Sequence, residues 1–381
     1  MAERREEDER FMQRALELAA GTIALASPNP QVGCVLVRNG EIIAEGAHLY
    51  QTRDHAEIVA LKQAGEAAQG ATAYVTLEPC SHHGRTGPCA DALIAAGITR
   101  AVVATEDPNP LVSGQGIARL RAAGVEVATG VLQQPARDLN EAFAHFIQHR
   151  TPFVTLKSAL SADGYLAPRT RTAAGPHWLT GPESLAHVQQ LRHASDAVLT
   201  GIGTILADDP ALTDRTNLPR RRPLLRVVLD TRLRTPPDSQ LLATAMQDVL
   251  ILTTPAAPIE KIQELHKSGA GVEIIDAESS RLNLNEVLKT LAQRNILSVL
   301  VEAGSHLNAA FLRHDLVDKA ILFHAPTKLG PNSIPFAEDI RPESIEQRLT
   351  RITRASYGPK GNPDTCITGY LHNPWNLIPD P

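Results

Sequence analysis

Residues 55–89 read HAEIVALKQAGEAAQGATAYVTLEPCSHHGRTGPC, and this stretch gathers one histidine, two cysteines and a glutamate. His55, Cys80 and Cys89 are of the types that bind zinc. Three protein ligands leave one tetrahedral position open for water, which is typical of catalytic rather than structural zinc sites. Glu57 lies two residues after His55 and is available to move protons without binding the metal. The stretch therefore predicts a hydrolytic zinc centre.

The same division of labour occurs in zinc deaminases that act on bases, where the metal activates water and a glutamate moves protons. Positions i and i+2 point apart in the middle of a helix. We therefore expect His55 and Glu57 in the first turn of a helix. Asp54 is a suitable N-cap, and Glu57 would then be the third helical residue.

The two cysteines are each predicted at the end of a secondary-structure element. Residues 73–77 predict a strand that delivers Cys80 at its end. Residues 88–96 predict a second helix, which Pro88 opens at a first-turn position. A helix N-terminus stabilises the thiolate form of Cys89, which is the form that binds zinc.

Two other interpretations of this stretch remain open from the residues alone. The histidine can be a surface residue and the cysteines apolar core residues. Alternatively, His82 or His83 supplies a fourth ligand and closes a structural site. Neither interpretation accounts for Glu57, so the set as a whole favours a catalytic site.

The composition predicts a soluble globular protein. The 381 residues are 43% hydrophobic and 21% charged, and the length suggests two domains or slightly more. No run is apolar enough to span a membrane, and Met1 to Arg14 lacks a signal-peptide core. Four cysteines do not form a disulfide framework, so we expect a reducing cytoplasm. The net charge of −5 argues against nucleic-acid binding.

Residues 1–148 predict one α/β domain. Its first helix continues to Ala19, and Asn39-Gly40 marks a hairpin. The predicted strands lie at 34–37, 42–46, 73–77, 100–104 and 125–127. The later predicted helices lie at 116–123 and 138–148. The alternation predicts helices on both faces of one sheet.

Residues 149–381 predict a second α/β domain, which begins at Thr151-Pro152. Its predicted strands lie at 153–159, 197–200, 225–229, 248–253, 272–275, 297–301 and 320–323. Its predicted helices lie at 182–193, 259–267, 284–294 and 306–313. We expect residues 219–223 to form an exposed loop and the chain after Leu371 to be irregular.

His55-Ala56-Glu57 and the run PCSHHGRTGPC from Pro79 to Cys89 resemble the bifunctional deaminase/reductase family of riboflavin biosynthesis (RibD). Eight residues separate the two cysteines, whereas cytidine and tRNA deaminases have two. Residues 28–33 also match the family's N-terminal motif. The resemblance covers nearly the whole chain. Its reductase part rests on the segments 161–164, 178–180, 206–210 and 301–304.

This resemblance implies a cytidine-deaminase-like α/β/α domain followed by a dihydrofolate-reductase-like α/β domain. The implied first reaction is zinc-dependent hydrolysis of the 2-amino group of 2,5-diamino-6-(5-phosphoribosylamino)pyrimidin-4(3H)-one. The second is NADPH-dependent reduction of the ribosyl group of 5-amino-6-(5-phosphoribosylamino)uracil to ribityl. The family also implies a homo-oligomer.

The first reaction assigns roles in the deaminase domain. Glu57 would take the water proton and pass it to the leaving ammonia. Asn29 is a candidate to bind the base edge, and Arg85 to pair with the substrate phosphate. Their structural alternatives are a turn-forming asparagine between prolines and a solvated surface arginine. His48 and His82 are weaker candidates.

The resemblance also implies contacts in the reductase domain. Cofactor contacts fall at Leu160, Trp178, Thr204, Asp208, Thr231, Gly304, Ser305, His306, Leu307, Asn308, Ala309 and Ala310. Substrate contacts fall at Pro176, Arg192, Leu212, Arg215 and Glu302. Gly304-Ser305 before a helix suits a dinucleotide pyrophosphate, and the two arginines suit a phosphate. A core tryptophan, an aspartate helix cap and surface arginines are the structural alternatives.

The sequence departs from the family pattern at a few positions. Pro176-His177 precedes the tryptophan where a small polar residue is usual. Gly87 stands where proline is common, and Ala162 and Tyr165 replace a leucine and a basic residue. None is a zinc ligand, so these departures affect only the expected substrate contacts around residues 160–177.

Two other function classes fit parts of the sequence. A nucleic-acid-editing deaminase with an unrelated C-terminal domain predicts a basic face and stacking aromatic residues. This chain is mildly acidic, with 4% aromatic residues. A structural zinc-binding module predicts a closed site that releases no ammonia. Loss of activity in the reductase half is a third alternative.

Overall fold

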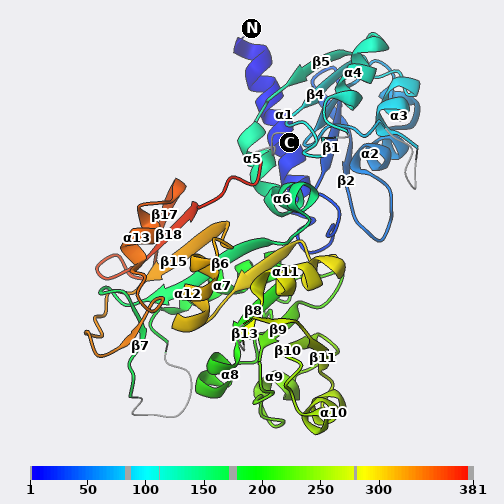
Figure 1. Cartoon of the computed structure of the whole chain (residues 1–381). Coiled ribbons are helices and arrows are strands. Elements are labelled where there is room, and N and C mark those ends of the chain that lie inside the picture. The colour runs from blue at the N-terminus through cyan, green and yellow to red at the C-terminus, as the bar shows by residue number, and fades with distance from the viewer. Residues whose placement is uncertain (1, 82–86, 111, 171–177, 279–280, 376–381) are drawn as a thin grey trace. The chain divides into compact units, whose positions relative to one another are not determined.

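The computed structural model describes residues 2–81, 87–110, 112–170, 178–278 and 281–375 (Figure 1). Contacts divide the chain into two compact units. Unit 1 contains the chain up to Arg150, together with Pro219–Arg222 and Trp375, and unit 2 contains Thr151–Leu218 and Pro223–Pro374. Within the described ranges, no helix combines the length and apolar character needed to cross a membrane.

A five-stranded mixed sheet forms the centre of unit 1. Its strands are β1 (Gly33–Arg38), β2 (Glu41–Ala47), β3 (Thr72–Val75), β4 (Arg100–Val103) and β5 (Glu126–Thr129), in the order β2-β1-β3-β4-β5. β1 runs antiparallel to β2 and β3, while β3, β4 and β5 are parallel. The predicted hairpin is confirmed, because Asn39 and Gly40 join β1 and β2 with φ of 55° and 78°, the positive values that a tight two-residue turn requires.

Helices cover both faces of this sheet, as predicted. They are α1 (Ala2–Ala20), α2 (Ala56–Ala64), α3 (Cys89–Ala95), α4 (Gln115–Ala122), α5 (Gln133–Leu139) and α6 (Glu141–His149), with a short 3₁₀ turn at Gly65–Ala68. One apolar cluster joins α1 and α5 to one face, and another joins α2, α3 and α4 to the opposite face. Successive strand residues serve the two faces in turn: Val35 packs with α1, whereas Cys34 and Leu36 pack with α2 and α3.

The prediction of one helix at 138–148 is wrong. The chain instead forms α5 and α6, which meet at Asn140. The Asn140 side chain accepts from the amide of Gln31 at 2.8 Å and donates to its carbonyl at 2.9 Å. This pair of hydrogen bonds fixes a non-helical residue at the junction.

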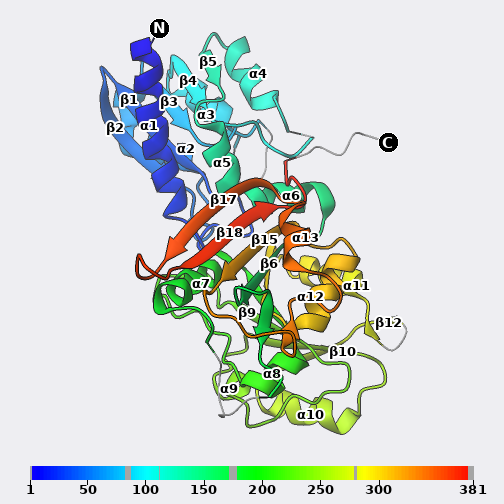
Figure 2. The same ribbon diagram turned by 90° about the vertical axis from the view of Figure 1, so that its left-hand side faces the viewer.

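Unit 2 is built on a nine-stranded sheet, which Figure 2 shows from a second side. Its order is β11-β10-β9-β8-β14-β6-β15-β18-β17. The strands are β6 (Phe153–Leu160), β8 (Ala197–Gly201), β9 (Leu225–Leu229), β10 (Val249–Thr253), β11 (Gly271–Ile274), β14 (Ser298–Val301), β15 (Lys319–His324), β17 (Thr350–Tyr357) and β18 (Asp364–Tyr370). The strands from β11 to β15 are parallel, and β18 and β17 are added antiparallel.

The remaining elements of unit 2 surround this sheet. Its helices are α7 (Pro182–Ala194), α8 (Ile202–Asp208), α9 (Gln240–Ala243), α10 (Ile259–Lys267), α11 (Leu284–Gln293), α12 (Ser305–Arg313) and α13 (Pro342–Glu346). Two small ribbons pair β12 (Ala277–Glu278) with β13 (Arg281–Leu282) and β7 (Tyr165–Ala167) with β16 (Ile334–Pro335). β17 was not predicted, because each of its residues is exposed or half-buried and its sequence lacks an apolar face. β18 was also missed, although most of its residues are buried.

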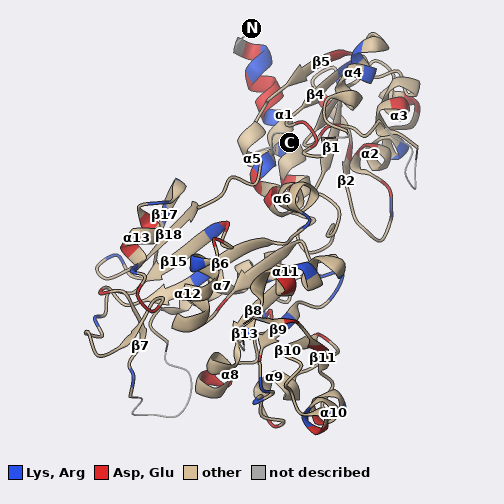
Figure 3. Ribbon diagram, viewed as in Figure 1, with Lys and Arg blue, Asp and Glu red and all other residues tan. Residues whose placement is uncertain are grey.

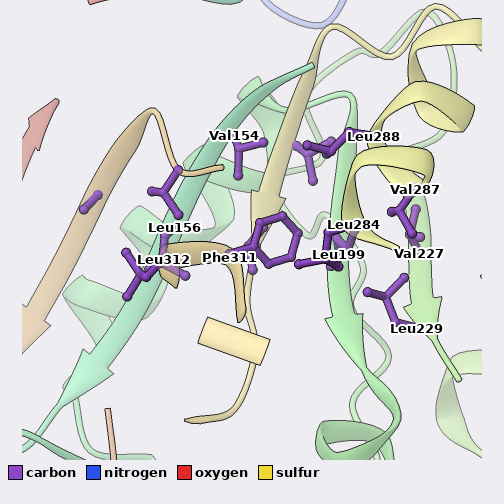
Figure 4. Close-up of a cluster of buried hydrophobic side chains, with 14 of the residues drawn as sticks. Val154, Leu156, Leu199, Val227, Leu229, Leu284, Val287, Leu288, Phe311 and Leu312 are labelled. Atoms are coloured by element: carbon purple, nitrogen blue, oxygen red, sulfur yellow. The ribbon is translucent and has the colours of Figure 1, made fainter. Parts of the chain in front are cut away.

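The main core of unit 2 lies between the sheet and two helices. Figure 4 shows Leu284, Val287 and Leu288 of α11 and Phe311 and Leu312 of α12 against strand residues that include Val154, Leu199 and Val227. Burying one such side chain contributes roughly 1.5–3 kcal/mol. A second cluster packs α8, α9 and α10 on other strand residues. Both faces of the sheet are therefore covered by helices, which leaves the ends of the strands to form sites.

Candidate functional site

The three predicted zinc ligands lie together in unit 1. Their donor atoms are all within 4.8 Å of one another. Nδ1 of His55 is 3.1 Å from Sγ of Cys89 and 3.5 Å from Sγ of Cys80. Tetrahedral zinc with normal bond lengths separates its ligand atoms by about 3.3–3.8 Å. One imidazole and two sulfurs at these separations fit a zinc ion.

His55 and Glu57 lie at a helix start, as predicted, but the predicted N-cap is wrong. His55 itself is the N-cap of α2, so Glu57 is its second residue. Asp54 instead forms an ion pair with Lys62 at 2.6 Å. The extended backbone of His55 turns its ring toward the cysteines before the helix begins.

The cysteines come from the loop after β3 and from the first residue of α3. The amide of Cys89 donates to Sγ of Cys80 at 3.3 Å. Hydrogen bonds from Cys89 and His55 outweigh burial and lower the pKa of Cys80 to about 4, while the bond to Cys80 and burial raise the pKa of Cys89. Cys80 therefore ionises before Cys89, and a zinc ion held here would bind both sulfurs as thiolates. Pro88 is the N-cap of α3 rather than a first-turn residue.

Glu57 lies beside this cluster and is 3% exposed. Burial raises its pKa to about 7, although its own backbone amide, His55 and a hydrogen bond with Cys89 oppose the increase. A carboxyl group with a pKa near neutrality can both accept and return a proton at physiological pH. Its position next to the ligands suits the predicted proton transfer.

Glu78 is a supporting residue that the sequence interpretation missed. Its buried carboxylate accepts four backbone hydrogen bonds, from residues 107, 114, 116 and 117, at 2.8–3.1 Å. The Glu78 carboxylate thus holds the start of α4 next to the segment that carries Cys80. Gly116 is required there, because a Cβ would collide with the carbonyl oxygen of Pro79. The only sequence signal was an acidic residue at the end of a buried strand.

Asn29 and His48 are connected at the same site. His48 places Nδ1 2.8 Å from the carbonyl oxygen of Asp54, so Nδ1 carries the proton and Nε2 accepts from Asn29 at 2.9 Å. The imidazole of His48 meets that of His55 edge-on, with ring centroids 5.6 Å apart. The imidazole of His48 therefore lies between Asn29 and the candidate metal ligand His55. Arg85, His82 and His83 lie outside the described residues.

A second candidate site is a cavity of about 1440 Å³ in unit 2. It exceeds the ~300–1,000 Å³ typical of a pocket for one small ligand. The predicted residues that line it are Trp178, Thr204, Asp208, Thr231, Gly304, Ser305, His306, Leu307, Ala310, Arg192, Leu212, Arg215 and Glu302. The structure thus brings most of the predicted cofactor and substrate residues to one cavity.

The remaining predicted residues lie elsewhere. Leu160 and Ala309 are fully buried in the core. Asn308 is fully buried and donates to the carbonyl of Phe336 at 3.0 Å. Since these three do not line the cavity, their cofactor contacts stay a prediction. Pro176 lies outside the described residues.

The most buried charges of the cavity are Arg192, Glu302 and Lys157. Arg192 binds Glu302 through two nitrogens at 2.7 and 3.1 Å, and Nζ of Lys157 is 3.9 Å from Glu302. Burial lowers the pKa of Lys157, which the attraction of Glu302 only partly offsets. The sequence interpretation missed Lys157. Its signal was a single charge in the middle of a central parallel strand, where apolar residues are the rule.

Charged residues of both signs are interspersed along the described chain. In Figure 3, Lys and Arg alternate with Asp and Glu along α1, and both signs are scattered over each unit.

Comparisons with known proteins match both units. Residues 5–105 match the family described as the cytidine and deoxycytidylate deaminase zinc-binding region, and residues 152–358 match the RibD C-terminal domain. The riboflavin biosynthesis protein RibD of Actinobacillus pleuropneumoniae is 42% identical over 321 residues, which are 84% of each chain.

Two solved structures are similar over nearly the full length. Acinetobacter baumannii RibD is 38% identical, with a TM-score of 0.80, and the match covers 96% of this chain and 99% of that one. The diaminohydroxyphosphoribosylaminopyrimidine deaminase/5-amino-6-(5-phosphoribosylamino)uracil reductase of Thermotoga maritima is 32% identical. Its TM-score is 0.79 and its coverage is the same.

Proposed function

Because the chain belongs to the RibD family of bifunctional riboflavin-biosynthesis enzymes, we propose that its two activities are divided between the two units. The family carries a zinc-binding deaminase domain and an NADPH-dependent reductase domain. The observation that supports the division is that His55, Cys80, Cys89 and Glu57 all lie in unit 1, whereas every cavity residue lies in unit 2. We assign residues 1–148 to deamination and 149–381 to reduction.

The deaminase acts on 2,5-diamino-6-(5-phosphoribosylamino)pyrimidin-4(3H)-one. His55, Cys80 and Cys89 would hold a zinc ion, which would lower the pKa of a water for attack at the carbon that bears the 2-amino group. Glu57 takes the proton of this water and returns it to the leaving amine, so that ammonia departs. Asn29 donates to His48 through its amide nitrogen, which leaves its side-chain oxygen to accept from an amino group of the base.

The reductase acts on the deaminated product, 5-amino-6-(5-phosphoribosylamino)uracil. The cavity of unit 2 would hold NADPH, which would supply the hydride for conversion of the ribosyl group to ribityl. Lys157 and Glu302 are the ionisable pair at the reacting end, and the lowered pKa of Lys157 suits proton donation to the sugar oxygen. Arg215 lines the same cavity and binds the substrate phosphate. Arg192 already holds Glu302, so it both positions that carboxylate and contributes charge to the phosphate site.

Incubation of the protein with the diaminopyrimidinone phosphate tests both reactions. Without NADPH, mass analysis should find only the deaminated product, with release of ammonia. With NADPH, the product should gain two further hydrogens. Unchanged substrate would refute the deaminase assignment, and a product that stops at deamination in the presence of NADPH would refute the reductase assignment.

We also propose a homo-oligomer. β17 is an edge strand that pairs only with β18 among the described strands, and the unpaired backbone of an edge strand can pair with another chain. Sedimentation should give at least twice the monomer mass; a monomer would refute the proposal.

The proposed reactions and the net charge of the chain indicate which ligands it binds. We propose a small phosphorylated pyrimidine as the ligand and no nucleic acid, because the net charge is −5. A cytoplasmic location is supported by four cysteines that form no disulfide. Fractionation of cells that express the protein would test the location.

A further inference from the structure

The cavity of unit 2 extends along the carboxyl edge of the parallel strands. It reaches from Lys157 on β6, across the segments that follow β14 and β8, to Leu229 and Thr231 at the end of β9. Three strand spacings of ~4.8 Å give this stretch a length of about 14 Å. The β9 end is thus remote from Lys157 and Glu302. An extended dinucleotide that reacts near Lys157 would place its adenosine half near β9.

An acidic residue occurs where β9 ends, but it faces inward. Asp230 is fully buried. One carboxylate oxygen accepts from the amide and hydroxyl of Thr235 at 2.8 and 2.9 Å, and the other is 3.4 Å from the amide of Arg232. In dinucleotide-binding folds an acidic residue after the strand binds the ribose 2′-hydroxyl of NAD, and an arginine there accommodates the 2′-phosphate of NADP. Asp230 cannot perform the first role, because its own loop occupies its oxygens.

The same loop presents a cation instead. The Asp230 hydrogen bonds shape the turn, and Thr254 fastens it by donating to the carbonyl of Thr231 at 3.1 Å. Arg234 belongs to this turn, and its side chain is exposed and lines the cavity. No hydrogen bond or ion pair links the Arg234 side chain to another described residue. Hydrogen bonds thus hold the backbone of this turn, while the guanidinium of Arg234 remains available.

Arg281 supplies a second cation at this end. It follows β11 in the chain, on the side of the sheet where β10 and β9 also end. Its neighbours are anchored: Leu282 packs in the core, and Asn283 caps α11 by accepting from two amides. Arg281 itself is exposed, lines the cavity and has no ion pair within the described ranges.

The charges of the cavity suit more than one phosphate. Six Lys or Arg and four Asp or Glu residues line it among those described. Arg192 and Lys157 neighbour Glu302, and Glu338 pairs with His306 and Arg313. Arg215 lies on the loop after α8 and serves the substrate phosphate. The pair Arg234 and Arg281 is not needed for that group.

We propose that Arg234 and Arg281, together with the hydroxyl of Thr231, bind the 2′-phosphate of NADPH and so select NADPH over NADH. This inference rests on the reductase function proposed above and assigns its cofactor specificity to named residues. Two guanidinium groups and a hydroxyl provide the donors that a dianionic phosphate requires. NADH, which carries a hydroxyl there, would gain little from them.

The direct test is calorimetric binding of 2′,5′-ADP and of 5′-ADP to the full-length protein. The first carries the 2′-phosphate and the second does not. Wild-type protein should bind 2′,5′-ADP at least tenfold more tightly. Arg234→Ala and Arg281→Ala should each weaken 2′,5′-ADP binding about tenfold or more, since a hydrogen bond to a charged group is lost, and should leave 5′-ADP binding within twofold.

Arg232→Ala is the matched control, because Arg232 is exposed on the same loop but does not line the cavity. It should bind both fragments as wild type does. The proposal is overturned if the two fragments bind equally well to wild type, or if the Arg234 and Arg281 variants behave as the Arg232 control does.

Steady-state reduction separates this proposal from the function it rests on. The Arg234→Ala and Arg281→Ala variants should raise KM for NADPH about tenfold and leave KM for NADH unchanged, so the selectivity ratio falls. If wild type reduces the deaminated substrate with neither cofactor, the reductase function fails. If it prefers NADPH and the variants keep that preference, only the specificity assignment fails.

Discussion

Gly46 on β2 lies directly against the backbone of Ala56, the residue between His55 and Glu57. A Cβ at Gly46 would collide with the carbonyl oxygen of Ala56 and would lie 2.7 Å from the amide nitrogen of Ala60. Neither group can move alone, because both belong to the hydrogen-bonded start of α2. The position of the candidate zinc ligand His55 therefore depends on glycine, which has no Cβ, at residue 46 of the neighbouring strand.

Gly46→Ala should displace α2 and weaken the site. Overpacking of this kind costs about 1–3 kcal/mol, so we expect a lower melting temperature and less bound zinc per chain. Gly361→Ala is the control, because a Cβ there meets no atom within 4 Å. Full zinc content and an unchanged melting temperature in Gly46→Ala would contradict the packing argument.

Asn29→Ala should lower deamination without loss of metal. The variant leaves an amino group of the bound base without its hydrogen-bond acceptor, which costs about 1–3 kcal/mol, or roughly 5–150-fold in kcat/KM. His48→Phe keeps a ring beside His55 but removes the acceptor that orients Asn29. It should cause a smaller decrease in the same direction. The measurements are ammonia release and zinc content, and unchanged kcat/KM in Asn29→Ala would exclude a contact with the base.

The acid stability of unit 1 should depend on Asp8. Its carboxylate binds Arg100 through two nitrogens at 2.7 Å and accepts from Tyr74 at 3.0 Å. Burial alone would raise the pKa of Asp8, but these hydrogen bonds and the charge of Arg100 lower it below 3.8. The stabilisation is therefore complete above the unfolded value of 3.8 and disappears as pH falls through the lower folded value.

Asp8→Asn should consequently melt well below wild type at pH 7, and the difference should shrink as pH falls to 3. Glu9→Gln provides the control, since Glu9 belongs to an exposed pair with Arg5, which contributes about 0–1 kcal/mol. A melting difference for Asp8→Asn that stays constant from pH 7 to pH 3 would show that the carboxylate does not titrate as inferred.

The parts predicted from sequence were those encoded locally. His55, Glu57, Cys80 and Cys89 lie within 35 residues, and short elements deliver each of them. The role of Glu78 could not be predicted, because its four partners begin 29 residues later, at Asp107. Asp54 has the composition of an N-cap, yet its ion pair with Lys62 and the extended backbone of His55 move the helix start by one residue.

The reductase cavity was harder to predict for a related reason. Lys157, Arg192 and Glu302 meet from β6, α7 and the end of β14, which are more than a hundred residues apart at the extremes. Only the strand order, in which β14 returns between β8 and β6, brings them together. The position of an isolated charge along a strand carries no information about that order.

Cys89→Ser should remove zinc and deamination together while reduction continues. A hydroxyl is a poor replacement for a thiolate, and two remaining protein ligands hold zinc weakly. Cys366→Ser is the control: this cysteine is buried in unit 2 and is not part of the cluster. Metal analysis and ammonia release are the measurements, and a full complement of zinc in Cys89→Ser would exclude Cys89 as a ligand.

Glu57→Gln should separate the two activities within one folded chain. Glu57 is no ligand, and glutamine preserves its volume, so zinc content and melting temperature should match wild type. The variant removes the proton transfer, which contributes typically 10²–10⁴-fold, so ammonia release should collapse by that factor. Reduction of supplied 5-amino-6-(5-phosphoribosylamino)uracil should continue at the wild-type rate, because every proposed cofactor residue lies in unit 2. If this folded, zinc-loaded variant no longer reduces the supplied substrate, the two reactions share a site and the division between the units is wrong.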